Sequence, residues 1–405
     1  MQLSSWLPLS FALAAMFLVP RSPGAVTPSP ARTPEHFAAL LARYDHAGRD
    51  EQRALEPQLD AMAGQRYAAS ARLFWYTELD AAKQAARRTG RPILALRMLG
   101  DLREDLSCAN SRLFRAVLYA NTEVSALLRD QFILYWSSER DVPVVTIDFG
   151  GGRKIVRTTT GNSAHYVLDA DGRVLDVLPG LYAPEVFRHE LGKSLALARE
   201  VAHLDEAGRQ RALRAYHREG QEAALQAMAA VADVPYIAGR RTLLGVGDIA
   251  RAQMATMSKA RIEVPDLRTI GLLGPGDASL DDPAAWSAIG QATWHLGPAA
   301  ILDAPSRALV ARLHDAGPDG PHTTPEQLAA VIARLEQHLV ADTAINELQL
   351  RLQIRAQLMA GQTDFASLND WIYANVFATP KTDPWLGLNP RTEFSGLPGD
   401  GVVVP

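Results

Sequence analysis

Cys108 is the only cysteine of the chain, and it lies where a predicted strand gives way to a predicted helix. The strand covers residues 92–99, which are mostly apolar, and apolar residues recur on one helical face over residues 113–118. The amino end of a helix carries a partial positive charge, which favours a thiolate and raises its nucleophilicity. Ser111 follows at the spacing Cys-x-x-Ser, so a hydroxyl stands where a redox dithiol has its second sulfur.

Serine cannot resolve a mixed disulfide, so this chain alone has no route to dithiol reduction. The Cys108 thiol stays open to monothiol reactions: glutathione exchange, retention of a client as a mixed disulfide, and a sulfenic-acid cycle. Cys108 would be the nucleophile in these reactions, and Ser111 would donate a hydrogen bond that stabilises the thiolate. The alternative is that Cys108 is a small apolar residue beneath a helix start, inert because it is buried.

The sequence around Cys108, from about residue 71 to residue 200, alternates between strand and helix patterns. Thr77 to Asp80 has the form of a capping box and predicts the start of the first helix. Gly150 to Gly152 predicts a hairpin turn rather than a phosphate loop, because no Gly-Lys-Ser/Thr ending follows. Asp171-Gly172 predicts the turn of a second hairpin, and Pro184 fits the first turn of a closing helix.

This order of elements resembles the thioredoxin superfamily over roughly residues 70–200. The strand and turn from Tyr166 to Gly172 resemble the Tyr-Val-Leu-Asp-x-x-Gly ending of exported bacterial thioredoxin-like proteins. The resemblance implies a thioredoxin-like fold with thiol–disulfide chemistry at Cys108. Two positions depart from the family: Ser107 replaces an aromatic residue, and Ser163 stands where a cis-proline faces the nucleophile. Because a non-proline cis peptide costs about 3 kcal/mol, we expect a trans bond before Ser163.

The segment at that position supplies the remaining candidate site residues. Asn162 and Ser163 would offer polar groups for binding opposite Cys108, and His165 shares the strand face of Ser163. The imidazole would suit proton transfer with the Cys108 thiol. The alternative is that Asn162 and Ser163 belong to a polar turn entering a strand, and that His165 is structural.

The chain changes character beyond residue 200. Residues 201–380 carry Ala-rich helical patterns separated by loops rich in Gly, Pro and Asp. We therefore expect an α/β thioredoxin-like domain at residues 71–200, followed by a mainly α-helical C-terminal domain. The apolar pattern of residues 35–70 predicts a helical spacer. The lack of helical or strand periodicity in residues 381–405 predicts an irregular C-terminal tail.

The first 34 residues combine an apolar run with a proline-rich stretch. Residues 7–19 are similar to the apolar core of a signal peptide, and residues 20–34 contain five prolines. This pattern predicts a signal peptide and linker at residues 1–34, and hence a periplasmic or secreted protein. No Lys or Arg precedes the run, so a cytoplasmic protein with an N-terminal helix is the alternative. The run is too short and interrupted for us to expect a membrane-spanning segment.

Composition and charge exclude several classes of protein. The formal net charge of −4 gives nucleic acid no electrostatic basis for binding. A single cysteine excludes an intramolecular disulfide, and the histidines lack metal-ligand spacing, so no metal is expected. Gly245 to Ala250 fits a dinucleotide fingerprint, but no βαβ pattern continues from it, so no cofactor is expected. Glutathione would be a co-substrate of the monothiol reaction.

Two functions stay open at this point. The first is a monothiol redox protein that exchanges disulfides with a protein client or a low-molecular-weight thiol at Cys108. The second is a non-catalytic binding module, in which the thioredoxin-like fold has lost its redox activity and the helical domain binds a protein partner or a ligand. The reactivity of the Cys108 thiol discriminates between them, because the first function requires an accessible thiolate.

Overall fold

The protein is described from a computed structural model. It describes residues 32–158, 161–231, 283–296, 301–315 and 323–386, together with Leu397, Pro398 and Val402. Residues 7–19 of the expected signal peptide and the fingerprint at residues 245–250 lie outside the described residues. Export is therefore still a prediction from the sequence. Among the described residues, no helix combines the length and the apolar character needed to cross a membrane.

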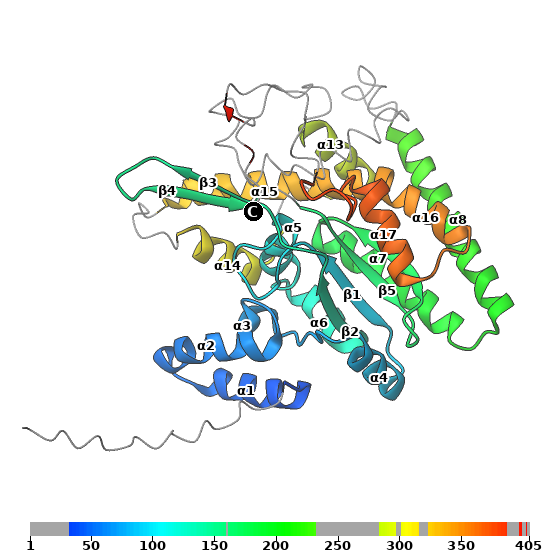
Figure 1. Cartoon of the computed structure of the whole chain (residues 1–405), viewed down its shortest axis with the longest axis horizontal. Coiled ribbons are helices and arrows are strands. Elements are labelled where there is room, and N and C mark those ends of the chain that lie inside the picture. The colour runs from blue at the N-terminus through cyan, green and yellow to red at the C-terminus, as the bar shows by residue number, and fades with distance from the viewer. Residues whose placement is uncertain are drawn as a thin grey trace, which may run out of the picture.

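The described elements form an α/β region with a mixed sheet, surrounded by many helices (Figure 1). The strands are β1 Ile93–Met98, β2 Ile133–Ser138, β3 Val144–Asp148, β4 Lys154–Thr158, β5 Ser163–Leu168 and β6 Val174–Pro179. The helices up to residue 231 are α1 Pro34–His46, α2 Arg49–Ala63, α3 Ala68–Ala71, α4 Leu79–Thr89, α5 Ala109–Leu113, the π-helical η1 Phe114–Leu118, α6 Thr122–Gln131, α7 Pro184–Val201 and α8 Glu206–Val231. The later helices are α13 Pro283–Trp294, α14 Ala304–His314, α15 Pro325–Ile345, η3 Asn346–Leu350, α16 Arg351–Met359, α17 Phe365–Trp371 and η4 Ile372–Val376.

Four strands form the main sheet, in the order β2-β1-β5-β6. β1 runs parallel to β2, whereas β5 runs antiparallel to both β1 and β6. The β5–β6 hairpin predicted around Asp171-Gly172 is confirmed, and Gly172 has the positive φ of 86° that its turn requires. Beside the sheet, Tyr76 makes one isolated parallel bridge to Tyr135 of β2.

Helices cover both faces of this sheet, which is why β5 and β6 are buried along their whole length. Neighbouring residues His165 and Tyr166 of β5 point to opposite faces. The His165 ring packs on Phe187 of α7, with ring centroids 5.0 Å apart. The Tyr166 ring packs at 5.0 Å on Phe365 of α17. Helix α7, which closes the α/β region, and the C-terminal helix α17 thus lie on opposite sides of β5.

The described elements beyond residue 201 are all helical, and they share the core of the sheet. Leu213 of α8 and Ile354 of α16 belong to the same buried apolar cluster as Leu175 and Leu178 of β6. The boundary expected at residue 200 falls at the end of α7. The buried core is continuous across that boundary, so the helices complete the packing of the sheet.

Two local predictions near the sheet had different outcomes. The hairpin turn at Gly150 to Gly152 is confirmed, because it joins β3 and β4 into a separate two-stranded ribbon that projects from the body (Figure 1). The capping box at Thr77 is wrong. α4 begins at Leu79 after Glu78, and the Glu78 side chain makes no capping hydrogen bond. Gly90 ends α4 with a left-handed φ of 69°.

Candidate functional site

Cys108 lies between β1 and α5, at the junction that the sequence predicts. Its backbone N–H donates to the Leu99 carbonyl oxygen at 3.2 Å, and the residue forms the N-cap of α5. The side chain is completely buried, with 0% of its surface exposed. A thiolate there would gain from the partial positive charge of the helix start but would lose its contact with water. Burial therefore opposes the ionisation that thiol chemistry needs.

Ser111 is buried beside Cys108, and its hydroxyl lies close to two other oxygen atoms. Ser111 Oγ is 2.7 Å from Ser107 Oγ and 2.8 Å from the Cys108 carbonyl oxygen. The single hydroxyl proton serves one acceptor at a time, and both of these acceptors are within hydrogen-bond distance. The expected hydrogen bond from Ser111 to the Cys108 thiolate stays a prediction.

Arg115 supplies a buried positive charge near Cys108 that sequence reasoning did not single out as buried. Its Nη1 donates to the carbonyl oxygens of Leu102 and Glu104, and its Nη2 donates to Ser107 Oγ at 3.1 Å. Burial lowers the pKa of Arg115 to about 10, and Cys108 is among the groups whose charge acts on it. The guanidinium therefore remains charged at neutral pH and favours a thiolate, in opposition to the burial of the sulfur.

The start of β5 lies against the Cys108 junction, as the sequence predicts. Ser163 pairs in register with Met98, the residue before Leu99, and Asn110 of α5 donates to the Gly161 carbonyl oxygen. The peptide bond before Ser163 is trans, as expected. Cys108 and the residues that begin β5 therefore lie at the same end of β1.

Four polar atoms at this junction are buried without a hydrogen-bond partner among the described residues. They are Asn110 Oδ1, Asn162 Oδ1, Ser163 Oγ and His165 Nδ1. Each of the four residues is 0% exposed. An unsatisfied buried polar atom costs about 1–3 kcal/mol, so these side chains are unusual for a purely structural core. They have the chemistry for binding, but a ligand in solvent does not reach them in this conformation.

His165 is enclosed by aromatic rings rather than directed to solvent. Its Nε2 lies 2.7 Å from the Tyr119 hydroxyl, and its ring centroid is 4.6 Å from that of Phe114. Burial lowers the pKa of His165 to about 3. An imidazole with so low a pKa is a weak base at neutral pH, which disfavours proton abstraction from a thiol. The packing is that of a structural histidine, and proton transfer with Cys108 stays untested.

The C-terminal part of the chain covers the beginning of β5. The Tyr373 hydroxyl in η4 donates to the Asn162 carbonyl oxygen at 3.2 Å. Asn162 Nδ2 donates to Thr379 Oγ1 at 3.0 Å, and Thr379 is itself 1% exposed. Two hydrogen bonds from residues more than 200 positions away thus fix Asn162 within the protein. The binding surface expected opposite Cys108 is occupied by the chain itself.

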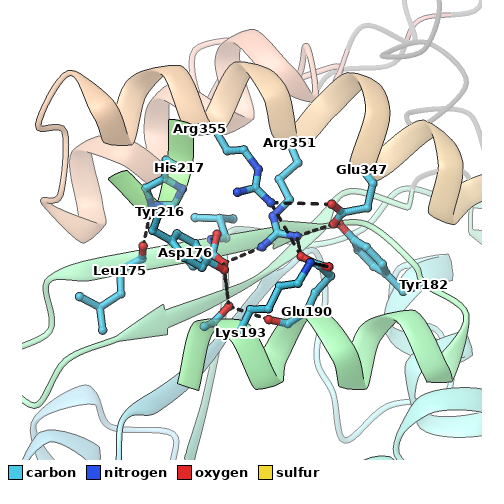
Figure 2. Close-up of polar contacts among 12 residues, drawn as sticks. Leu175, Asp176, Tyr182, Glu190, Lys193, Tyr216, His217, Glu347, Arg351 and Arg355 are labelled. Carbon is cyan, nitrogen blue, oxygen red and sulfur yellow. Dashed lines mark hydrogen bonds and ion pairs between the residues drawn. The ribbon is translucent and has the colours of Figure 1, made fainter. Parts of the chain in front are cut away.

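A buried cluster of charged side chains lies farther along the sheet, and sequence reasoning missed it (Figure 2). Arg351 of α16 is at its centre and is 0% exposed. Its guanidinium contacts Asp176 of β6, Glu190 of α7 and Glu347 of η3, each at 2.6 Å. Arg355, one turn further along α16, lies 3.8 Å from Glu190 and 3.9 Å from Glu347.

The electrostatics of this cluster depend on the balance between burial and Arg351. Burial raises the pKa of Asp176, but Arg351, His217 and Arg355 outweigh it and hold the pKa of Asp176 below its usual range. The same competition with Arg351 leaves the pKa of Glu190 lowered. Burial dominates at Glu347, whose pKa is raised. Neighbouring carboxylates thus differ in their tendency to bind a proton.

One signal in the sequence could have indicated the cluster. Asp176 interrupts the otherwise apolar run at residues 174–178, and a charge inside a buried strand requires a partner. Glu347 and Arg351 also stand four residues apart on one helix pattern, as an ion pair would. The pairing of Asp176 with Arg351, however, joins segments 175 residues apart, and local sequence patterns do not predict such a contact.

No group of three or more His, Cys, Asp or Glu side chains in the described part of the chain is arranged to hold a metal ion. Comparison of this chain with family models, with curated proteins and with solved structures finds no significant match. The function is therefore argued from the geometry of the chain's own residues.

Proposed function

We propose that this chain is a thioredoxin-like binding module that does not catalyse thiol–disulfide exchange. The strand order β2-β1-β5-β6, with β1 and β2 parallel, supports a thioredoxin-like arrangement. Further support comes from the helix that follows β1 at Cys108 and from α7, which closes the α/β region after the β5–β6 hairpin. The binding role is proposed for the surfaces that the helical part adds to this region.

The observation that carries the proposal is the complete burial of the Cys108 junction. Thiol–disulfide exchange requires a client sulfur to approach the attacking sulfur, so the nucleophile must be accessible. Here Cys108, Ser111, Asn162 and Ser163 are all 0% exposed. The contacts of Tyr373 and Thr379 with Asn162 hold the C-terminal segment over the start of β5. A client could not meet the thiol without displacing that segment.

The proposal is tested by the rate at which Cys108 reacts with a small disulfide reagent, such as 5,5′-dithiobis(2-nitrobenzoate). We expect the native full-length protein to react at least a hundred times more slowly than the same protein in guanidinium chloride, because the thiol is sealed. The matched control is Asp50→Cys in a Cys108→Ala background. Asp50 has a fully exposed side chain, so this cysteine reports the rate at an open site of the same protein.

A monothiol enzyme predicts the opposite outcome. Its native thiol would react as fast as the exposed control cysteine, and mass spectrometry would find a glutathione adduct at Cys108 after incubation with oxidised glutathione. Such a result would refute the binding module and support redox chemistry, with Arg115 favouring the thiolate. A slow thiol without an adduct would support the proposal.

A further inference from the structure

A groove outside the Cys108 junction has the features of a small-ligand site. It has a volume of about 320 Å³ and lies between α7 and α8, next to the buried charge cluster. Tyr216 and Leu197 give it an apolar wall, Lys193, Glu200 and Glu219 are exposed at it, and Arg355 lines it from α16. The volume falls within the range of pockets that bind small molecules.

Arg355 is buried and lies over the Tyr216 ring, 5.8 Å from its centroid, but no carboxylate is at hydrogen-bond distance from its guanidinium. Its side chain is 5% exposed, and its Nε has no hydrogen-bond partner among the described residues. Its ion pairs with Glu190 and Glu347, at 3.8 and 3.9 Å, are too long for hydrogen bonds. Arg351 takes the close positions on these carboxylates, as Figure 2 shows. Arg355 therefore retains donors for which the described residues supply no acceptor at hydrogen-bond distance.

Gly220 of α8 brings the guanidinium of Arg355 into the wall of the groove. A Cβ at this position would overlap the terminal nitrogens of Arg355, so the glycine makes room for them. A glycine inside a long helix weakens the helix relative to alanine. At Gly220 that cost is tied to the placement of one cationic side chain.

The charges at the groove favour a particular kind of ligand. Arg355 is joined by Lys193, whose side chain is half exposed and whose Nζ lies 2.8 Å from Glu190 Oε1. A guanidinium binds a carboxylate through two parallel hydrogen bonds. Glu200 and Glu219 are negative groups exposed at the same groove.

We propose that this groove binds the carboxylate of a small, partly apolar ligand through Arg355, and that Glu200 and Glu219 favour a ligand that also carries an amino group. An aliphatic α-amino acid has this chemistry. The inference rests on the proposed binding function and adds the class of ligand. It does not depend on Cys108, which is not among the residues that line the groove.

Calorimetric titration of the full-length protein with three matched probes tests the inference. The probes are L-leucine, 4-methylpentanoate, which lacks the amino group of leucine, and 3-methylbutylamine, which lacks its carboxylate. We expect leucine to bind, 4-methylpentanoate to bind several-fold more weakly, and 3-methylbutylamine not to bind. Equal affinity for the first two would overturn the part assigned to the glutamates. A Kd of about 1 mM is that of a weak ligand. If neither leucine nor 4-methylpentanoate binds at 10 mM, well above that Kd, the whole inference would be overturned.

Two variants separate the role of Arg355 from its contribution to folding. Arg355→Gln removes the charge, and we expect at least a tenfold loss of affinity for leucine. Gly220→Ala keeps the arginine but displaces its guanidinium, and alanine favours the helix, so affinity should fall without a loss of thermal stability. The control is Arg214→Gln, because Arg214 is an exposed arginine of α8, the helix that also contains Gly220. Unchanged affinity in both test variants would contradict the assignment.

The outcomes separate this inference from the proposed function. A sealed Cys108 thiol combined with no carboxylate binding would overturn the ligand class alone. A rapidly reacting thiol combined with leucine binding that depends on Arg355 would overturn the non-catalytic role and leave the groove assigned.

Discussion

Arg351 Nη2 in α16 donates a hydrogen bond to Asp176 Oδ2 in β6 at 2.6 Å, and neither side chain is more than 1% exposed. The contact joins the edge strand of the sheet to a helix 175 residues later in the chain. The Ser194 and Tyr216 hydroxyls donate to the same carboxylate oxygen at 2.6 and 2.7 Å. Helices α7, α8 and α16 are thus tied to β6 through one buried carboxylate.

Arg351→Met should strongly destabilise the protein. Methionine fills a similar volume but leaves the carboxylates of Asp176, Glu190 and Glu347 without their central cation. Removal of one partner from a buried ion network typically costs about 3–5 kcal/mol, because the remaining charge is buried without compensation. The free energy of unfolding from urea titration at pH 7 measures this loss.

Arg87→Gln is the matched control for Arg351→Met. Arg87 pairs with Asp171 at 2.9 Å, but both side chains are more than half exposed. An exposed pair contributes no more than about 1 kcal/mol. The free energy of unfolding of this variant should therefore be close to that of the native protein. Similar losses in the two variants would show that the buried cluster has no special part in stability.

The fragment of residues 71–200 should not fold alone. In this fragment Asp176 loses Arg351 and Tyr216, and apolar residues such as Leu175 lose the helical side of their core. A buried carboxylate without a cation and an uncovered sheet face both favour the unfolded chain. Far-ultraviolet circular dichroism of the purified fragment should show little ordered structure at pH 7.

Addition of residues 201–405 in trans provides the control for the fragment. Because the missing contacts come from that part of the chain, co-expression should restore a folded complex that elutes as one species in gel filtration. A cooperative thermal transition of residues 71–200 alone would contradict the prediction and support two independent domains.

The sequence predicts the parts of this fold whose signals are local. The turn at Asp171-Gly172 and the helix start at Pro184 agree with the structure because each depends on residues within a few positions. The junction of Cys108 with β5 also agrees, but that expectation came from the resemblance to the thioredoxin superfamily, because alternating helix and strand patterns do not set the order of strands in a sheet. The burial of that junction could not be predicted. It depends on Tyr373 and Thr379, which meet Asn162 only in the folded chain.

Stability should fall as the pH is lowered from about 6.5 towards 4. Burial lowers the pKa of His165 to about 3 and that of His217 to about 4. In the unfolded chain both histidines bind a proton near pH 6.5, whereas in the native protein they remain neutral until far lower pH. The unfolded state therefore gains protons first, and each histidine contributes a slope of up to about 1.4 kcal/mol per pH unit. Both contributions are fully present above pH 6.5.

The carboxylates of the cluster act over a different part of the pH range. Asp176 and Glu190 have lowered pKa values, so they add a further loss of stability below about pH 4.5. Glu347 has a raised pKa and acts in the opposite direction. Between pH 5 and 6.5 the two histidines lower the stability as the pH falls, whereas Glu347 acts against them. Replacement of His165 by Phe in a Tyr119→Phe background removes one histidine titration while keeping the rings. We expect a smaller slope than in the Tyr119→Phe protein, and an unchanged slope would refute the assignment to His165.

The native protein should not reduce insulin faster than dithiothreitol does alone, and Ser111→Cys should not change this. Ser111→Cys restores the Cys-x-x-Cys spacing, but the new sulfur is placed where the hydroxyl contacts Ser107 and the Cys108 carbonyl oxygen, fully buried. A reductase also needs its client to reach Cys108, and the hydrogen bonds of Tyr373 and Thr379 to Asn162 keep that face covered.

Deletion of residues 361–405 from the Ser111→Cys variant distinguishes a covered thiol from an unsuitable one. This deletion removes both contacts to Asn162, together with α17, and circular dichroism must first show that the sheet survives. If covering by the C-terminal segment is what blocks exchange, the truncated variant should react rapidly with the disulfide reagent and reduce insulin slowly. Appreciable insulin reduction by the native chain would contradict both the monothiol limit and the burial of Cys108, since one accessible sulfur cannot complete the cycle.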